Sequence, residues 1–171
     1  DGLEYRDPRR YGLLALYEGV SPRAIPEIRS LGKDPLQPGF TGEWLGRRLH
    51  GSRREIKSFL LDQGVLAGIG NIYACEALFE ARIHPGRRCA TLSGRESGRL
   101  AAAVQKVLRD AIRRRGTTFS DFRGADGKAG GHRDHLAVYM REGKQCVECG
   151  RPIRRISQGN RGTFFCQQCQ R

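Results

Sequence analysis

Apolar positions between residues 55 and 85 repeat at helical spacing on both sides of a glycine-rich turn. Residues 56–60 carry apolar side chains at i, i+3 and i+4, and residues 72–78 show much the same spacing. This periodicity predicts two short helices, each with an apolar face. The turn between them, GVLAGIGN, ends at Gly70 and Asn71, and we expect Asn71 to cap the second helix.

Two helices are expected before this unit. Ser21 and Pro22 form an N-cap and first-turn pair that opens a short helix, and Gly32 ends it. The stretch that follows, LGKDPLQPGF, is rich in proline and glycine and is predicted to be a loop. Thr41 is then expected to cap a helix over residues 42–49 that contributes apolar side chains to the core.

Two capping-box signatures, each a serine followed three residues later by a glutamate, predict two more helix starts. The first, Ser52 to Glu55, would begin the helix that carries Lys57. The second, Ser93 to Glu96, would begin a long amphipathic helix that ends in three arginines and a glycine. This long helix is interpreted as packing structure without chemistry.

The first eighteen residues show strand signals. Leu3 and Tyr5 alternate with polar neighbours, and an apolar run at residues 13–16 follows the breaker sequence DPRRYG. The pattern predicts two strands around a basic turn. Because an isolated hairpin is marginal in water, we expect further strands upstream of this segment.

Four of the six cysteines form two C-x-x-C pairs near the end of the sequence, Cys146 with Cys149 and Cys166 with Cys169. Sixteen residues separate the pairs, a spacing typical of four-thiolate zinc sites. Four protein ligands fill the zinc tetrahedron and leave no position for water, so the predicted ion is structural. Two disulfides are the alternative.

The chain has 31 lysines and arginines against 18 acidic residues, a formal net charge of +13. Such an excess indicates a polyanionic partner, nucleic acid before an anionic membrane. Ribosomal proteins share this composition, so charge alone does not separate them from DNA-binding proteins. No stretch approaches the roughly 18 apolar residues of a membrane span, and the first residues do not resemble a signal peptide.

The sequence GIGNIYACEALF followed by ARIHP resembles the helix–two-turns–helix motif of the formamidopyrimidine-DNA glycosylase family. The DPRRYG loop and the cysteine ribbon are also similar to that family, and the resemblance extends from Tyr5 to Arg171. It implies an α+β fold. A helical helix–two-turns–helix domain would precede a small β-hairpin zinc ribbon, with remnant strands of an N-terminal β-sandwich in front.

The resemblance divides the chain as follows. Residues 1–18 would be the remnant strands of the β-sandwich, and residues 19–40 a linker with a short helix. Residues 41–135 would form the helical DNA-binding domain, in which the loop 117–135 closes over a damaged base. Residues 136–171 would form the four-cysteine zinc finger.

The glycine turn is the first expected DNA contact. A helix N-terminus that presents free backbone N–H groups at a glycine turn is a ready anion site. By resemblance, Asn71 and Lys57 hold DNA phosphates near the lesion, and Gly70 belongs to the same turn. Arg53 lies in a first helical turn, where its charge opposes the helix dipole; a nearby phosphate would explain it, and a solvated basic face is the alternative. An ordinary helical hairpin with a glycine turn and a capping asparagine is the alternative for this stretch.

Further contacts are implied elsewhere. In the family's DPRRFG loop the first arginine faces the base left unpaired by flipping, and the aromatic residue wedges into the stack. Those roles fall to Arg9 and Tyr11, with Arg10 beside them. Arg161, at the tip of the zinc hairpin, is implied to clamp phosphates or to donate a proton in the δ-elimination. Because a guanidinium has a pKa above about 12, we favour the clamp.

The resemblance implies a base-excision-repair enzyme that removes oxidised purines, such as 8-oxoguanine and formamidopyrimidines, from duplex DNA and cleaves the abasic site. In the family an N-terminal proline is the nucleophile. The chain starts downstream of it, so we expect no activity from these residues alone. A non-catalytic zinc-ribbon module and a ribosomal or other RNA-binding protein are the alternatives. One structural zinc, a damaged double-stranded DNA partner, a monomeric state and a cytoplasmic, nucleoid-associated location are expected.

Overall fold

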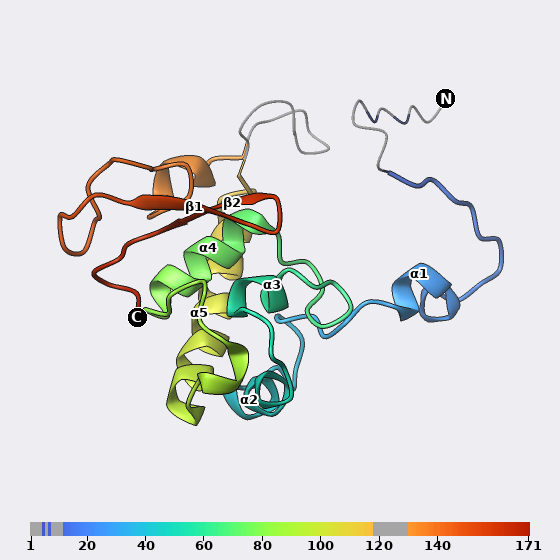
Figure 1. Cartoon of the computed structure of the whole chain (residues 1–171). Helices are drawn as coiled ribbons and strands as arrows, with labels where there is room; N and C mark the ends of the chain where they lie inside the picture. The colour runs from blue at the N-terminus through green and yellow to red at the C-terminus, as the bar shows by residue number, and fades with distance from the viewer. Residues whose placement is uncertain (1–4, 6, 8–11, 118–129) are drawn as a thin grey trace. The chain divides into compact units, whose positions relative to one another are not determined.

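A computed structural model of the chain describes residues 5, 7, 12–117 and 130–171. The chain folds as two compact units, Asp1–Leu31 and Gly32–Arg171 (Figure 1). Arg9, Arg10 and Tyr11, predicted to contact DNA, lie outside the described residues, as do residues 118–129 of the predicted lesion loop. No helix among the described residues is long and apolar enough to cross a membrane.

The first unit contains short helical turns and, in its described part, no strand. The strand predicted over residues 13–16 is wrong: the three leucines there are 73%, 62% and 95% exposed. An extended segment without a neighbouring strand has nothing to pair its backbone groups with. The predicted helix after Ser21 is divided into a 3₁₀ turn, Pro22–Ala24, and helix α1, Pro26–Arg29, each with a proline in its first turn.

In its described residues, the second unit is built on four α-helices and a hairpin (Figure 1). Its helices are α2 (Gly42–His50), α3 (Ile56–Leu60), α4 (Asn71–Glu80) and α5 (Gly94–Arg113). Short 3₁₀ turns occur at Cys89–Thr91 and His132–His135.

The predicted caps of α2 and α5 are confirmed. The Thr41 side chain accepts a hydrogen bond from the backbone of Trp44, 3.1 Å away. Ser93 and Glu96 form both bonds of a capping box. Gly116, just after α5, has φ +81°, and its N–H bonds to the carbonyl of Ala111, which closes the helix end.

The predicted caps of α3 and α4 are wrong. Glu55 precedes α3 without a side-chain cap, and the Ser52 hydroxyl instead accepts a bond from the backbone of Arg54. Gly70 is the N-cap of α4, so Asn71 is its first helical residue. In both cases the side chain expected to cap the helix bonds to a distant residue instead. Glu55 binds Gln158, and Asn71 binds Gly162 of the hairpin.

The hairpin consists of antiparallel strands β1 (Arg154–Gln158) and β2 (Arg161–Phe165). Gly159 and Asn160 form its two-residue turn, with φ of +53° and +58°. Left-handed backbone at both central residues matches the turn type that suits two-residue hairpins. The tip predicted from the sequence is therefore confirmed.

Helix α4 takes part in both hydrophobic clusters of this unit. Ala74, Ala77 and Leu78 pack into the main core with side chains of α2, α3 and α5. Cys75 and Phe79, on another side of α4, pack with residues of the cysteine ribbon such as Ile153 and Phe164. The ribbon thus shares a core with the helices instead of forming a separate globule.

Candidate nucleic-acid interface

The tip of the zinc hairpin meets the N-terminus of α4. Asn71 Nδ2 donates a hydrogen bond of 3.0 Å to the carbonyl of Gly162. Lys57 Nζ, from α3, lies 2.6 Å from the hydroxyl of Thr163 and 3.5 Å from the same carbonyl. Arg161 is the next residue toward the tip and is exposed. The structure therefore brings together Lys57, Asn71 and Arg161, which are far apart in the sequence.

Lys57 is much more buried than a surface phosphate contact would be. The residue is only 1% exposed, and its ammonium group faces the hairpin. Burial lowers its pKa, the positive charge of Arg161 lowers it further, and the Cys75 thiol acts in the opposite direction. Among the described residues, no carboxylate pairs with Lys57 within 4.0 Å. It is a buried cation held by neutral oxygen atoms.

The glycine turn before α4 is open on its outer face. Gly68 has φ +81°, whereas Gly70 is extended with φ −102°. A Cβ atom on Gly70 would meet no atom of the described structure within 4 Å, so another molecule can approach the backbone there. Gln63, which was not predicted as part of the site, fixes the turn: its side-chain amide donates to Ile69 O and accepts from Gly68 N, both at 2.9 Å.

Arg53 is exposed, and its carbonyl accepts a 2.8 Å bond from Arg88. Neighbouring Arg54 is engaged within the fold, because it pairs with Asp62 at 2.7 Å and lies 5.3 Å from the ring centre of Phe59. Both arginines are exposed, but among the described residues only the guanidinium of Arg54 has a carboxylate partner.

A groove of about 420 Å³ lies beside the hairpin carbonyl that Asn71 binds. Its walls include Gly162, the exposed Arg155, and the rings of Tyr139 and Phe164, which meet edge to face at 5.1 Å. The Arg155 guanidinium lies 5.9 Å from the Phe164 ring centre. Glu142 also lines the groove, 3.9 Å from Arg155, so the groove combines one arginine, two aromatic rings and a carboxylate. The arginine-rich β1 strand was the available sequence signal.

Glu76 connects α4 to the segment that leads into the ribbon. Its carboxylate is 6% exposed and accepts bonds from the backbone N–H groups of Ala137, Val138 and Tyr139 at 2.8, 3.0 and 2.8 Å. Burial raises its pKa, and the three N–H donors oppose that rise. A glutamate inside the apolar run NIYACEALF was the signal that could have revealed this contact.

The four cysteines of the ribbon converge as predicted. Their sulfur atoms all lie within 4.8 Å of one another, with Cys146 to Cys169 at 3.9 Å and Cys149 to Cys166 at 3.5 Å. Tetrahedral zinc with bonds of about 2.3 Å places sulfurs roughly 3.8 Å apart, whereas a disulfide needs about 2.05 Å. The donor set and spacing fit one structural zinc ion, and the disulfide alternative is wrong.

Comparison with known proteins agrees with this geometry. Residues 31–123 match the model of the formamidopyrimidine-DNA glycosylase H2TH domain, and residues 143–171 match a zinc finger found in FPG and IleRS. The chain belongs to the formamidopyrimidine-DNA glycosylase family. The recognition made from the sequence, the mixed fold of helices and hairpin, and the zinc ion are therefore confirmed.

Several relatives of the chain carry the family name. The formamidopyrimidine-DNA glycosylase of Geobacter sulfurreducens is 46% identical over 169 residues, which cover 99% of this chain and 62% of that protein. The corresponding protein of Aromatoleum aromaticum is 44% identical over 171 residues, with 63% of it covered. The chain thus spans about three fifths of the length of these relatives.

Solved structures of the family superpose well. The MutM (Fpg) protein of Thermus thermophilus has a TM-score of 0.81 and 45% identity, over 86% of this chain and 56% of that one. A variant of Lactococcus lactis FPG in complex with Fapy-dG-containing DNA has a TM-score of 0.80 and 31% identity, over 86% and 55%.

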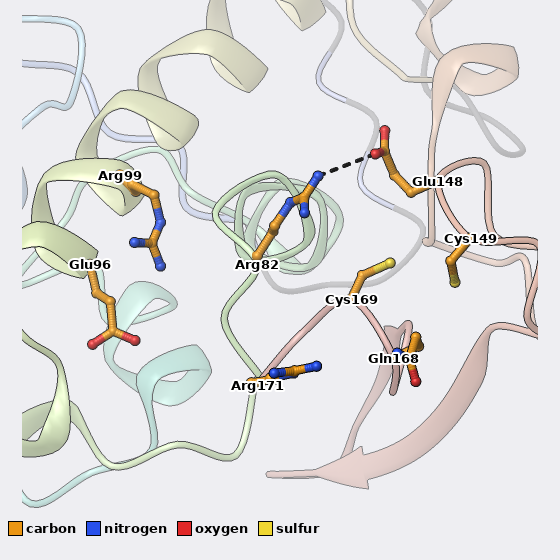
Figure 2. Close-up of a pocket in the computed structure, with 8 residues that line it drawn as sticks. All are labelled: Arg82, Glu96, Arg99, Glu148, Cys149, Gln168, Cys169 and Arg171. Carbon is orange, nitrogen blue, oxygen red and sulfur yellow. Dashed lines mark hydrogen bonds and ion pairs between the residues drawn. The ribbon is translucent and has the colours of Figure 1, made fainter.

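In this family member a second, arginine-lined cavity of about 640 Å³ lies at the other end of α4. Figure 2 shows Arg99 and Glu96 on its helical side and Cys149 and Cys169 on its ribbon side. Glu148 also lines the cavity and pairs with Arg82 at 3.4 Å, so the cavity contains charges of both signs.

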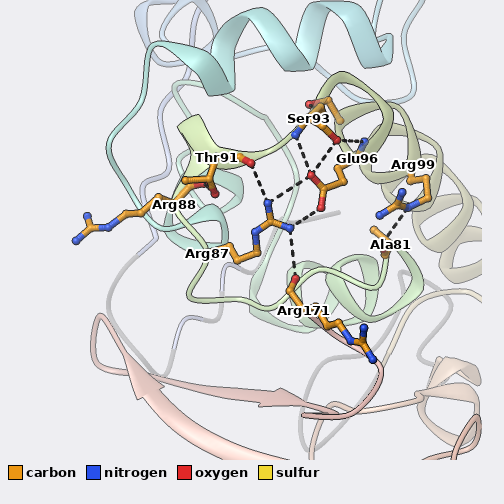
Figure 3. Close-up of polar contacts among 9 residues, drawn as sticks. Ala81, Arg87, Arg88, Thr91, Ser93, Glu96, Arg99 and Arg171 are labelled. Carbon is orange, nitrogen blue, oxygen red and sulfur yellow. Dashed lines mark hydrogen bonds and ion pairs between the residues drawn. The ribbon is translucent and has the colours of Figure 1, made fainter.

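Arg87 organises the helical side of that cavity. Its guanidinium binds both carboxylate oxygens of Glu96, the carbonyl of Thr91 and the carbonyl of Arg171 (Figure 3). The contact with Arg87 lowers the pKa of Glu96 to about 2, with help from Ser93. His84 N donates a 2.9 Å bond to the same Arg171 carbonyl, so the last ribbon residues are tied to the helical core.

Proposed function

We propose that this chain is the DNA-binding part of a base-excision-repair glycosylase that removes oxidised purines, such as 8-oxoguanine and formamidopyrimidines, from duplex DNA. The observation that supports it is the convergence of Lys57, Asn71 and Arg161 at the hairpin tip. The names of the relatives and the DNA-bound family structures agree with this proposal.

Each residue of the tip has a distinct task in the proposal. Arg161 offers a planar guanidinium that binds a phosphate with two N–H groups. Asn71 Nδ2 has two hydrogens, and only one is needed for Gly162, so the other can reach a phosphate oxygen at the open face of Gly70. Lys57 adds positive potential from behind the tip. Arg53 adds a further positive charge to the surface that would follow the DNA strand. Arg9, Arg10 and Tyr11 keep their proposed roles at the unpaired base.

In this proposal the whole protein, and not residues 1–171 alone, catalyses the reaction. An amine attacks C1′ of the flipped nucleotide, and the base leaves as the glycosidic bond breaks. The Schiff base formed at C1′ then loses a C2′ proton and eliminates the 3′ phosphate as the C3′–O bond breaks. We propose that residues 1–171 alone carry out neither step, and that Arg161 acts on the phosphate and not as an acid. A single chain is proposed to engage one lesion, as a monomer in the bacterial cytoplasm.

The proposal is tested by fluorescence anisotropy with the zinc-loaded chain. An 8-oxoguanine duplex is compared with an undamaged duplex and with a structured RNA of equal length. We expect Arg161→Gln and Asn71→Ala to weaken duplex binding, and Arg161→Gln to reduce the salt slope by about 0.9.

Arg154→Gln is the matched control, because Arg154 pairs with Phe165 at the strand end away from the tip. It removes the same charge and should change binding less than Arg161→Gln. Equal effects of the two substitutions, or tighter binding of the structured RNA than of either duplex, would contradict the proposal.

A further inference from the structure

Helix α5 presents a continuous basic face to solvent. We define the basic face by its five cations, all exposed: Arg95, Arg99, Lys106, Arg109 and Arg113. Their spacings of four, seven, three and four residues keep them on one side of the helix. Over 18 residues this face is about 27 Å long. The opposite side of α5, which includes Leu100 and Val104, is buried in the core.

The arrangement is unfavourable for the helix itself. Arg95 and Arg99, and likewise Arg109 and Arg113, are like charges one turn apart, and such pairs destabilise a helix. Arg95 also stands in the first turn, where the helix dipole disfavours a cation. A polyanion lying along α5 would remove all of these penalties.

Some cations of the basic face have no carboxylate partner among the described residues. Lys106 pairs with Glu80 at 2.7 Å, and Arg113 pairs with Asp110. Among residues 12–117 and 130–171, no carboxylate lies within 4.0 Å of the charged groups of Arg95, Arg99 or Arg109. Arg99 donates from its Nε to the carbonyl of Ala81, and its terminal nitrogens have no carboxylate partner in the described part of the chain.

The centre of the face is separate from the tip of the hairpin. Lys106 contacts Glu80, the last residue of α4, whereas Asn71 is the first. Nine residues of helix separate these points by about 14 Å. A phosphate at Asn71 and one at Lys106 therefore lie on different ends of α4.

We propose that the basic face of α5 binds the phosphate backbone of a second duplex DNA segment while the hairpin tip holds the first. The inference rests on the proposed function, because it assumes that duplex DNA occupies the tip. Regularly spaced exposed cations without aromatic side chains suit a sequence-independent backbone contact. A chain with two such surfaces can pass from one DNA segment to another without full release.

The test counts duplexes per chain by sedimentation velocity at low ionic strength, with the zinc-loaded chain and short undamaged duplexes. We expect two duplexes per chain. The neutral variant Arg95→Gln/Arg99→Gln/Arg109→Gln keeps good helix formers on α5. It should bind one duplex as before and the second at least about tenfold more weakly, with a salt slope lower by about 0.9 for each lost contact.

The control variant Arg23→Gln/Arg29→Gln/Arg47→Gln removes the same charge from exposed positions elsewhere. It should keep the second binding event. Circular dichroism establishes that both variants are folded. One duplex per chain for the unmodified protein, or equal loss in the two variants, overturns the inference. Loss of the first duplex through Arg161→Gln, with the second retained, supports separate sites, whereas no duplex binding at all refutes the proposed function itself.

Discussion

The backbone N–H of Tyr139 donates a 2.8 Å hydrogen bond to the buried carboxylate of Glu76 on α4. The two preceding N–H groups bind the same carboxylate, so one side chain orients the whole segment that enters the ribbon. Tyr139 in turn packs on Phe164 of β2 and lines the groove beside Gly162. Glu76 thus holds one wall of the groove against the helical core.

Glu76→Gln should destabilise the protein by about 1–3 kcal/mol, because an amide replaces an oxygen that now accepts buried N–H bonds. Urea unfolding measures the change. Glu80→Gln is the control, since Glu80 makes only an exposed pair with Lys106 and should change the unfolding free energy by less than about 1 kcal/mol. Equal effects of the two substitutions would show that the buried contact is unimportant.

Lys57→Met should leave the unfolding free energy unchanged or raise it, because a buried cation without a carboxylate partner is replaced by an apolar chain of similar size. DNA affinity should nevertheless fall, because the positive potential behind the tip is lost. Denaturant unfolding and anisotropy on the same samples test both statements. A loss of stability above about 2 kcal/mol would indicate a structural role for the amine instead.

The same lysine predicts a pH dependence. The pKa of Lys57 is lower in the folded protein than the value of about 10.4 in the unfolded chain. At pH values between the folded and the unfolded pKa, the unfolded chain therefore binds more protons. The contribution of Lys57 to the free energy of unfolding therefore increases as the pH rises through that interval. Unfolding curves of the unmodified protein and of Lys57→Met should converge toward the alkaline end of it. A constant difference at all pH values would contradict the lowered pKa.

Glu96 governs a second, acidic transition. Its pKa of about 2 lies below the usual value, so its stabilising contribution is complete above about 4.5 and is lost as the pH falls toward 2. The shift corresponds to at most about 3 kcal/mol. Glu96→Gln retains the capping geometry but loses the charge pair with Arg87, and its unfolding free energy should depend less on pH in this range. Glu43→Gln, at an exposed pair, should behave like the unmodified protein.

Removal of zinc should disturb α4 as well as the ribbon. Cys146 and Cys166 pack in one cluster with Cys75 and Phe79 of that helix, and structural zinc contributes folding energy directly. After chelation we expect amide hydrogen exchange to become faster in the ribbon and in α4 around Cys75 and Phe79. The exchange rates in α2 should increase less. Exchange that increases only in residues 143–171 would show that the two parts are independent.

Local signals in the sequence were sufficient for several elements. The caps at Thr41 and Ser93, the hairpin tip and the four zinc ligands depend on residues within a few positions of one another, or on a metal with fixed geometry. Such interactions are visible in a short window of sequence.

Other positions were decided by distant partners. Asn71 is a residue type and position typical of an N-cap, yet its side-chain amide bonds to Gly162. Lys57 is a residue type typical of the surface, yet it is buried and its amine bonds to Thr163. Residues 13–16 have the pattern of a strand but no partner strand among the described residues. Tertiary contacts override local preference in these places, and a single sequence does not show them.

The contacts of Lys57 with Thr163 and of Asn71 with Gly162 join residues 106 and 91 positions apart. Closing such long loops is entropically costly, so these contacts form late compared with the helices. During synthesis the helices emerge well before β2, because the chain leaves the ribosome from its N-terminal side. A nascent chain can therefore bury its helical core while the glycine turn at Gly70 still lacks its hairpin support. The phosphate site proposed at the tip is therefore completed only when β2 closes on α4.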